Sequence, residues 1–201
     1  PPGGKASRLA TNPICIGVPH AEEPLVLDFS TSATAEGKVR VKWIAGEQTP
    51  DGWLIDNQGR PTNDPSVLYE PTPPGAILPF GGPQAYKGFG LSLMIDIFCG
   101  ALSGGLVSRE KAESPKGNCV FMMIIDPAHF GGAEHFANEV KQVAQFVRDC
   151  PRADGVDRIL LPGDPEREMR AKRKSEGIAL DDGNWQKLIE LAEQLGVEPP
   201  A

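Results

Sequence analysis

Two short runs rich in isoleucine, valine and leucine lie near the start of the chain, "NPICIGVP" at 12–19 and "PLVLDFS" at 24–30. Prolines bound both runs, and their unbroken apolar character is typical of buried strands joined by a tight turn. Small side chains fill residues 30–35. Because small side chains let another backbone or a ligand approach closely, we expect such an approach there.

The apolar residues within 34–48 fit both a helical and a strand period. Val39, Trp43 and Ile44 follow a helical stripe, whereas Val39, Val41 and Trp43 alternate as a strand would, and we favour the helix. Residues 46–83 are dense in glycine and proline and show no sustained period. They predict an ordered loop region, since it contains apolar side chains to bury: Trp53, Leu54, Ile55, Leu68 and Tyr69.

The second half of the chain shows clearer patterns. An amphipathic helix is predicted from about residue 87 to Gly104, with an apolar stripe at Leu91, Met94, Ile95, Phe98 and Leu102. "NCVFMMIID" at 118–126 predicts the strongest strand, buried on both faces. A helix is predicted at about 134–149, with Phe136, Val140, Val143 and Val147 buried. A strand and a Pro-Gly turn at 158–163 lead into a further, basic helix. A last helix is predicted at about 182–196, with an apolar stripe of Trp185, Leu188, Ile189, Ala192 and Leu195. Mixed strands and helices indicate an α/β or α+β fold.

Composition narrows the class of protein. The chain has 201 residues, and its 20 basic against 27 acidic side chains give a formal net charge of −7. A negative field repels phosphate backbones and anionic lipid, so we expect neither nucleic acid nor membrane as a partner. Apolar stretches such as 120–125 are shorter than the roughly 20 residues of a membrane span. We therefore expect a cytoplasmic protein.

Familiar catalytic and metal motifs are missing from the sequence. "GFGLSL" at 88–93 supplies two glycines of a Rossmann fingerprint, with Leu93 where the third belongs. No P-loop and no G-x-S-x-G serine elbow is present. The three histidines are isolated and the four cysteines form no C-x-x-C pair, so we expect no metal site.

Lys87 is the residue that carries a binding hypothesis. It lies at the predicted first turn of a helix, where unpaired N–H groups and the helix dipole favour an anion. Gly88 and Gly90 flank it and allow a ligand near the backbone. A phosphate or carboxylate site is one interpretation; a solvated lysine beside a glycine turn is the other.

Five ordered stretches carry a family resemblance. They are "LATNPICIGVP", "VLDFSTSATAEGKV", "GEQTPDGWLIDNQGRPTNDP", "ILPFGGPQAYKGFGLSLMIDI" and "LLPGDPERE". Together they resemble the malate/L-lactate dehydrogenase family, which is unrelated to the Rossmann-type lactate dehydrogenases. The resemblance implies a hydride transfer between NAD or NADP and a small 2-oxo, 2-imino or 2-hydroxy acid, and a cofactor domain with a largely antiparallel or mixed sheet and flanking helices.

The resemblance also implies cofactor contacts at matching positions. In "VLDFSTS" these are Asp28, Phe29, Ser30 and Thr31, with Asp28 directed to ribose hydroxyls; a strand-capping aspartate is the alternative. In "AYKG" Tyr86, Lys87 and Gly88 would hold the pyrophosphate or ribose. In "LPGDPE" Gly163, Asp164 and Pro165 would approach the cofactor, an ordinary Pro-Gly turn being the alternative. Which of NAD and NADP binds is left open.

Members of the family take their catalytic proton from a histidine in an N-terminal segment. None of His20, His129 and His135 matches that position, so we assign no catalytic residue and expect the general acid upstream of Pro1. The resemblance then implies a cofactor-binding domain at 1–133, a C-terminal helical segment at 134–201 packing back on it, and a homodimer. A non-catalytic dinucleotide-binding or structural module of the same fold is the alternative.

The missing histidine generates a prediction for residues 1–201 alone. A steady-state assay with NADH or NADPH and pyruvate, oxaloacetate or a cyclic imino acid should show little or no turnover, because no group would protonate the developing alkoxide. A normal kcat would contradict the assignment.

Overall fold

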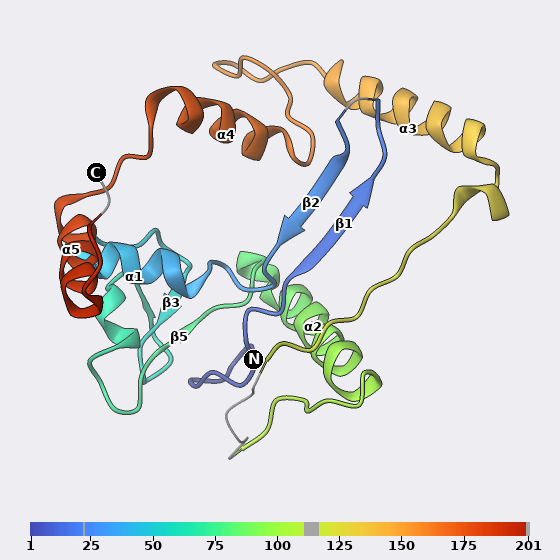
Figure 1. Cartoon of the computed structure of the whole chain (residues 1–201). Helices are drawn as coiled ribbons and strands as arrows, with labels where there is room; N and C mark the ends of the chain where they lie inside the picture. The colour runs from blue at the N-terminus through green and yellow to red at the C-terminus, as the bar shows by residue number, and fades with distance from the viewer. Residues whose placement is uncertain (22, 111–116, 200–201) are drawn as a thin grey trace. The chain divides into compact units, whose positions relative to one another are not determined.

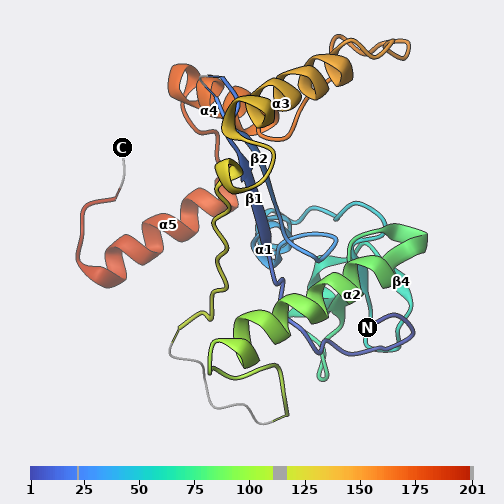
Figure 2. The same ribbon diagram turned by 90° about the vertical axis from the view of Figure 1, so that its right-hand side faces the viewer.

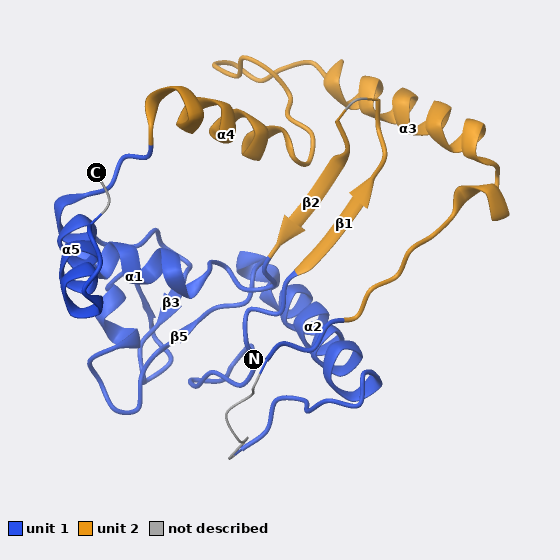
Figure 3. Ribbon diagram, in the orientation of Figure 1, with its two compact units in different colours: residues 1–13, 30–120, 178–201 blue, residues 14–29, 121–177 orange. Residues whose placement is uncertain are grey.

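The computed structural model describes residues 1–21, 23–110 and 117–199. The chain divides into two compact units, shown in different colours in Figure 3. Unit 1 comprises 1–13, 30–120 and 178–201, and unit 2 comprises 14–29 and 121–177. This partition follows packing; the functional division at residue 133 stays a prediction.

Unit 2 is built on an antiparallel hairpin of β1 (Ile14–Val18) and β2 (Leu25–Phe29). Ile14 is opposite Phe29 and Val18 is opposite Leu25, so the two predicted strands are confirmed (Figure 1). They are not buried on both faces, because Ile16 is 50% and Leu27 40% exposed. The helices of this unit are a 3-10 turn at Pro127–His129, α3 (Ala133–Arg148) and α4 (Asp164–Glu176).

Unit 1 holds a small three-stranded antiparallel sheet in the order β4-β3-β5. Its strands are only two residues long, which is why the glycine- and proline-rich sequence predicted an ordered loop rather than strands. Leu54 and Ile55 of β3 are buried, as predicted. The elements of this unit are α1 (Glu36–Ala45), β3 (Leu54–Ile55), β4 (Pro61–Thr62), β5 (Ala76–Ile77), α2 (Ala85–Asp96), α5 (Asp182–Leu195) and 3-10 turns at Pro65–Leu68 and Gly82–Gln84.

The run of small residues after β2 packs against another backbone, as the sequence predicted. Ser32 forms an isolated antiparallel bridge with Pro79, and the Ala33 N–H donates to the Leu78 carbonyl at 2.7 Å. Thr31, at 1% exposure, accepts at its carbonyl from the Phe80 N–H at 3.1 Å. Residues 30–33 are therefore fixed along the chain segment that leads into α2.

Helix α2 is confirmed and continues through a wide π-helical stretch, Ile97–Leu102, to the predicted end near Gly104 (Figure 2). Its predicted buried stripe is wrong, because Met94, Phe98 and Leu102 are 46%, 48% and 64% exposed. The buried positions carry small residues instead: Gly88, Ser92 and Gly100. A Cβ at Gly88 would lie 2.3 Å from the Phe80 carbonyl oxygen, so the helix packs through a contact that only glycine allows.

Two predicted strands are wrong. Residues 118–126 form no strand, and the run is exposed, from 44% at Phe121 to 88% at Ile124. No described strand pairs with the run, and apolar composition alone does not make a strand. Residues 158–161 also form no strand, although the Pro162 carbonyl that follows them accepts from the Val26 N–H of β2 at 3.1 Å.

The remaining helices are where the sequence predicted them, with narrower buried faces. In α3 the buried residues are Val140 and Ala144, whereas Val143 and Val147 are 54% and 38% exposed. In α5 only Ala192 is buried, although the helix packs on α1, where the Asn184 side chain donates to the Val41 carbonyl at 3.3 Å.

One described helix, Gly82–Leu102, is long and apolar enough to cross a membrane by length and composition. The sequence prediction missed it because Lys87 and Asp96 interrupt the apolar run without breaking the helix. The core helix of a protein folded in water passes the same test, so this observation is weak evidence for a membrane. The absence of a membrane partner stays a prediction.

The contact of Gly88 with Phe80 generates a stability prediction. Gly88→Ala should lower the free energy of unfolding by about 1–3 kcal/mol, because the new methyl group overlaps a backbone carbonyl that cannot move freely. Urea unfolding followed by circular dichroism measures the change.

Gly90→Ala is the matched control, two residues along the same helix. A Cβ at Gly90 would meet nothing within 4 Å, so this variant should be neutral or gain about 0.5–1 kcal/mol from helix propensity. Equal effects of the two substitutions would show that the close contact does not hold the helix.

Candidate functional site

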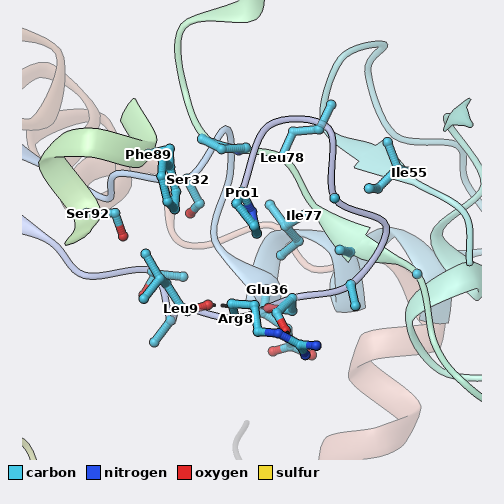
Figure 4. A pocket seen from close by; sticks show the side chains of 18 of the residues that line it. Pro1, Arg8, Leu9, Ser32, Glu36, Ile55, Ile77, Leu78, Phe89 and Ser92 are labelled. Atoms are coloured by element: carbon cyan, nitrogen blue, oxygen red, sulfur yellow. Dashed lines mark hydrogen bonds between the residues drawn. The ribbon is translucent and has the colours of Figure 1, made fainter. Parts of the chain in front are cut away.

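Unit 1 contains an open pocket of about 470 Å³. Most of its wall is apolar, formed by residues from β3, β5, α2 and the N-terminal segment, including Leu9, Ile55, Leu68, Ile77, Leu78 and Phe89. Figure 4 shows Phe89 and Ser92 of α2 on one side and Ile55 of β3 on the other. The volume lies within the range of ligand sites, and a mostly apolar wall with a few polar groups is typical of them.

Glu36 and Tyr69 line the pocket and form a hydrogen bond with each other. The Glu36 carboxylate accepts from Arg40 Nε at 3.0 Å and Nη2 at 2.8 Å, and from the Tyr69 hydroxyl at 2.9 Å. Burial, with the hydrogen bond to Glu36, raises the pKa of Tyr69, so its hydroxyl remains a donor. Trp43 stacks on the Tyr69 ring with centroids 4.3 Å apart. Glu36 is thus a compensated charge.

Arg8 is the pocket-lining cation that keeps its charge available. Its Nη1 donates to the Ser7 carbonyl at 3.3 Å, and Arg8 makes no ion pair within the described ranges. Figure 4 shows its guanidinium group among the side chains that line the pocket. Because Arg40 offsets Glu36, Arg8 gives this wall a net positive charge. A guanidinium group presents a planar fork that suits a carboxylate.

The predicted anion site at Lys87 lies at the start of α2. Lys87 is the third residue of the helix, so its position in the first turn is confirmed. The side chain is exposed, and Nζ lies 6.0 Å from the ring centroid of Tyr86, which is 61% exposed. Both side chains are accessible to a ligand. Gly88 faces Phe80, so packing accounts for the glycine there, and its contact with a cofactor stays a prediction.

Ser30 and Thr31 belong to the same unit, and Thr31 also lines the pocket. The Thr31 hydroxyl reaches the carbonyl oxygens of Thr11 at 3.1 Å and Asn12 at 3.0 Å. The Ser30 hydroxyl lies 3.0 Å from that of Ser32. Thr31 therefore has a structural role in the described chain, and its cofactor contact stays a prediction.

Unit 2 holds the other expected cofactor residues. Asp28 and Phe29 end β2, and the Asp28 side chain is exposed; the cofactor contacts of both residues stay predictions. Gly163 precedes α4 with φ of 95°, a conformation that favours glycine, and a Cβ there would lie 3.3 Å from the Val26 nitrogen. The Gly163 turn is thus brought beside β2, the strand that ends with Asp28 and Phe29.

Asp164 starts α4, followed by Pro165, and is held by several partners. It accepts from the Leu161 N–H at 2.8 Å, forms an ion pair with Arg167, and lies 3.7 Å from Arg148 Nη2. Burial alone would raise the pKa of Asp164, yet the hydrogen bond and the two guanidinium groups hold that pKa below its usual range. Asp164 is therefore held in place by its partners, and the contacts of Asp164 and Pro165 with a cofactor stay predictions.

Sequence reasoning missed Arg8, Glu36 and Tyr69 as pocket residues. Nothing in their local pattern marks them, since they come together only through the packing of three separated segments. Conversely, none of the histidines lines the pocket, and no group of three or more metal-ligating side chains occurs within residues 1–21, 23–110 and 117–199.

Residues 1–189 match the model of the malate/L-lactate dehydrogenase family. Among similar proteins, hydroxycarboxylate dehydrogenase B of Escherichia coli strain K12 is 40% identical over 199 residues, which is 96% of this chain and 54% of that protein. L-lactate dehydrogenase of Cupriavidus necator is 37% identical over 206 residues, covering 100% of this chain and 57% of that protein.

The chain is also similar in structure to solved dehydrogenases. Malate dehydrogenase of Pyrococcus horikoshii matches with a TM-score of 0.79 and 29% identity, over 100% of this chain and 55% of that one. Sulfolactate dehydrogenase of Methanocaldococcus jannaschii matches with a TM-score of 0.71 and 32% identity, over 98% and 56%. The chain spans about half the length of the relatives it matches.

Proposed function

The chain belongs to the malate/L-lactate dehydrogenase family, and we propose that it is the dinucleotide-binding part of a 2-hydroxyacid dehydrogenase. The observation that carries the proposal is the family match over residues 1–189, which includes the exposed Lys87 in the first turn of α2. The bound nicotinamide would take or give the hydride that interconverts a 2-hydroxy and a 2-oxo acid.

Lys87 and Tyr86 fit the anionic part of a dinucleotide. The exposed Lys87 ammonium group favours a phosphate, and this part of the proposal rests on the side chain, because the Ala85 N–H at the start of α2 already donates to the Gly82 carbonyl. The exposed Tyr86 ring beside Lys87 offers a flat surface for a ribose or base. In this proposal Lys87 binds the pyrophosphate and Tyr86 orients it.

The pocket fits the small acid. Its apolar wall would exclude water from the reacting carbon, and Arg8 would hold the carboxylate that every 2-oxo or 2-hydroxy acid carries. Arg40 offsets the charge of Glu36, which also accepts from the Tyr69 hydroxyl, so the charge of Arg8 is not cancelled on this wall. A proton donor is still needed at the carbonyl, and we assign that role to a histidine outside residues 1–201.

The wider setting follows from the same assignment. Within this proposal the enzyme works in the cytoplasm, takes NAD or NADP, and forms a homodimer.

A non-catalytic dinucleotide-binding module remains the second candidate. It is favoured by one observation: no histidine of the described chain lines the pocket. The two candidates differ in turnover by the complete protein, since both bind the dinucleotide.

The role of Lys87 generates a binding prediction. Fluorescence titration with NADH or NADPH should show binding to residues 1–201, and Lys87→Ala should weaken it about ten- to hundredfold, because a charged hydrogen bond to phosphate is lost. Added salt should weaken binding to the parent chain more than binding to the variant.

Lys38→Ala is the matched control. Lys38 is also an exposed lysine and the third residue of its helix, α1, and it lies outside the pocket. Its removal should leave affinity within about twofold, since it has the same charge but no assigned contact. An equal loss in both variants would assign the effect to net charge rather than to Lys87.

The role of Arg8 generates a second binding prediction. Calorimetric titration with oxaloacetate or malate, in the presence of the dinucleotide, should show affinity reduced about tenfold or more by Arg8→Gln. Arg60→Gln is the control, because Arg60 is exposed, belongs to the same unit and does not line the pocket. Unchanged acid binding in the Arg8 variant would remove the carboxylate from this pocket.

A further inference from the structure

A second pocket lies within unit 2 and is dominated by arginine. It has a volume of about 570 Å³ and is open to solvent, and four of its eight lining residues are Arg148, Arg152, Arg158 and Arg167. The other polar linings are Asp157, Asp164 and Glu168, with Ile159 as the apolar one. The pocket is therefore lined by four guanidinium groups and three carboxylates, so one positive charge is in excess.

The ion pairs identify which arginine is in excess. Arg148 and Arg167 share Asp164, and Arg158 pairs with Glu168. Arg152 is exposed and makes no ion pair in the described chain; its guanidinium group donates only to the backbone carbonyl of Asp157. Arg152 thus keeps most of its N–H donors and its full charge for a ligand.

The surrounding sequence has the same sign. Residues 148–174 contain eight of the 20 basic residues of the chain and six acidic ones, although the whole chain has a net charge of −7. A local positive field in an acidic protein concentrates anions at one place. The excess of positive charge therefore lies at this open pocket.

We propose that this pocket binds a phosphate monoester, with Arg152 as its main ligand and Arg148 and Arg158 as supporting donors. A phosphate dianion accepts several parallel N–H bonds, which suits planar guanidinium groups better than single ammonium groups. Asp164 acts as a positioning residue, because its ion pairs hold Arg148 and Arg167 at the pocket. A carboxylate ligand would use only one guanidinium fork.

Two sources can supply such a phosphate. One is the 2′-phosphate of NADP, which rests on the proposed dinucleotide function and would make the enzyme prefer NADP over NAD. The other is a separate phosphorylated small molecule. The pocket is large enough for either ligand, so titration with different phosphate probes is needed to distinguish the two sources.

Calorimetric titration of residues 1–201 with NADP, NAD and inorganic phosphate tests the proposal, because NAD lacks the phosphate monoester that NADP carries. The chain should bind NADP at least about tenfold more tightly than NAD, and Arg152→Gln should remove that preference. Arg152→Lys should restore part of it, because the charge returns without the fork. Arg170→Gln is the control, since Arg170 is an exposed residue of α4 that does not line the pocket.

The outcomes separate this proposal from the proposed function. A preference for NADP over NAD that depends on Arg152 supports the phosphate site and assigns it to NADP. Binding of inorganic phosphate that depends on Arg152, without NADH or NADPH binding, supports the site and contradicts the dinucleotide function. No phosphate binding by any probe, or equal loss in the Arg152 and Arg170 variants, overturns the proposal. Circular dichroism spectra that match the parent chain establish that the variants fold.

Discussion

The buried Thr31 residue is the junction on which the candidate site of unit 1 depends. Its hydroxyl reaches the Thr11 and Asn12 carbonyls, and its own carbonyl accepts from the Phe80 N–H. Phe80 in turn packs on Gly88, one residue after Lys87. A chain of buried contacts therefore sets where α2 begins and where its first-turn lysine lies.

Much of the helical structure could be predicted from the sequence, whereas the sheets could not. Helices such as α3 and α5 follow from a 3.6-residue period and clear end signals, which are local properties. The run at 118–126 was predicted as a strand from composition, yet strand formation needs a backbone partner that composition does not specify. The two-residue strands of β3, β4 and β5 are too short to produce a period.

The residues of the candidate site also differ in whether the sequence alone could identify them. Lys87 could be found from the sequence because its position depends on a helix start and neighbouring glycines, both visible locally. Arg8 and Arg152 could not be found from the sequence, because they are available to a ligand only since the charged side chains around them form ion pairs with other residues. Glu36 is offset by Arg40 four residues along α1, but the pocket it lines is completed by residues far away in the sequence. Charge compensation is a property of the folded chain, and it decides which cations remain available.

The exposed run from Val120 to Ile125 has a consequence for handling the protein in solution. Six consecutive apolar residues without charge or proline match the composition of segments that stack into cross-β fibrils. Asp126 and Pro127 follow immediately, and both oppose the addition of further strands, one through its charge and the other through its missing N–H. These two residues therefore limit how far such stacking extends along the chain.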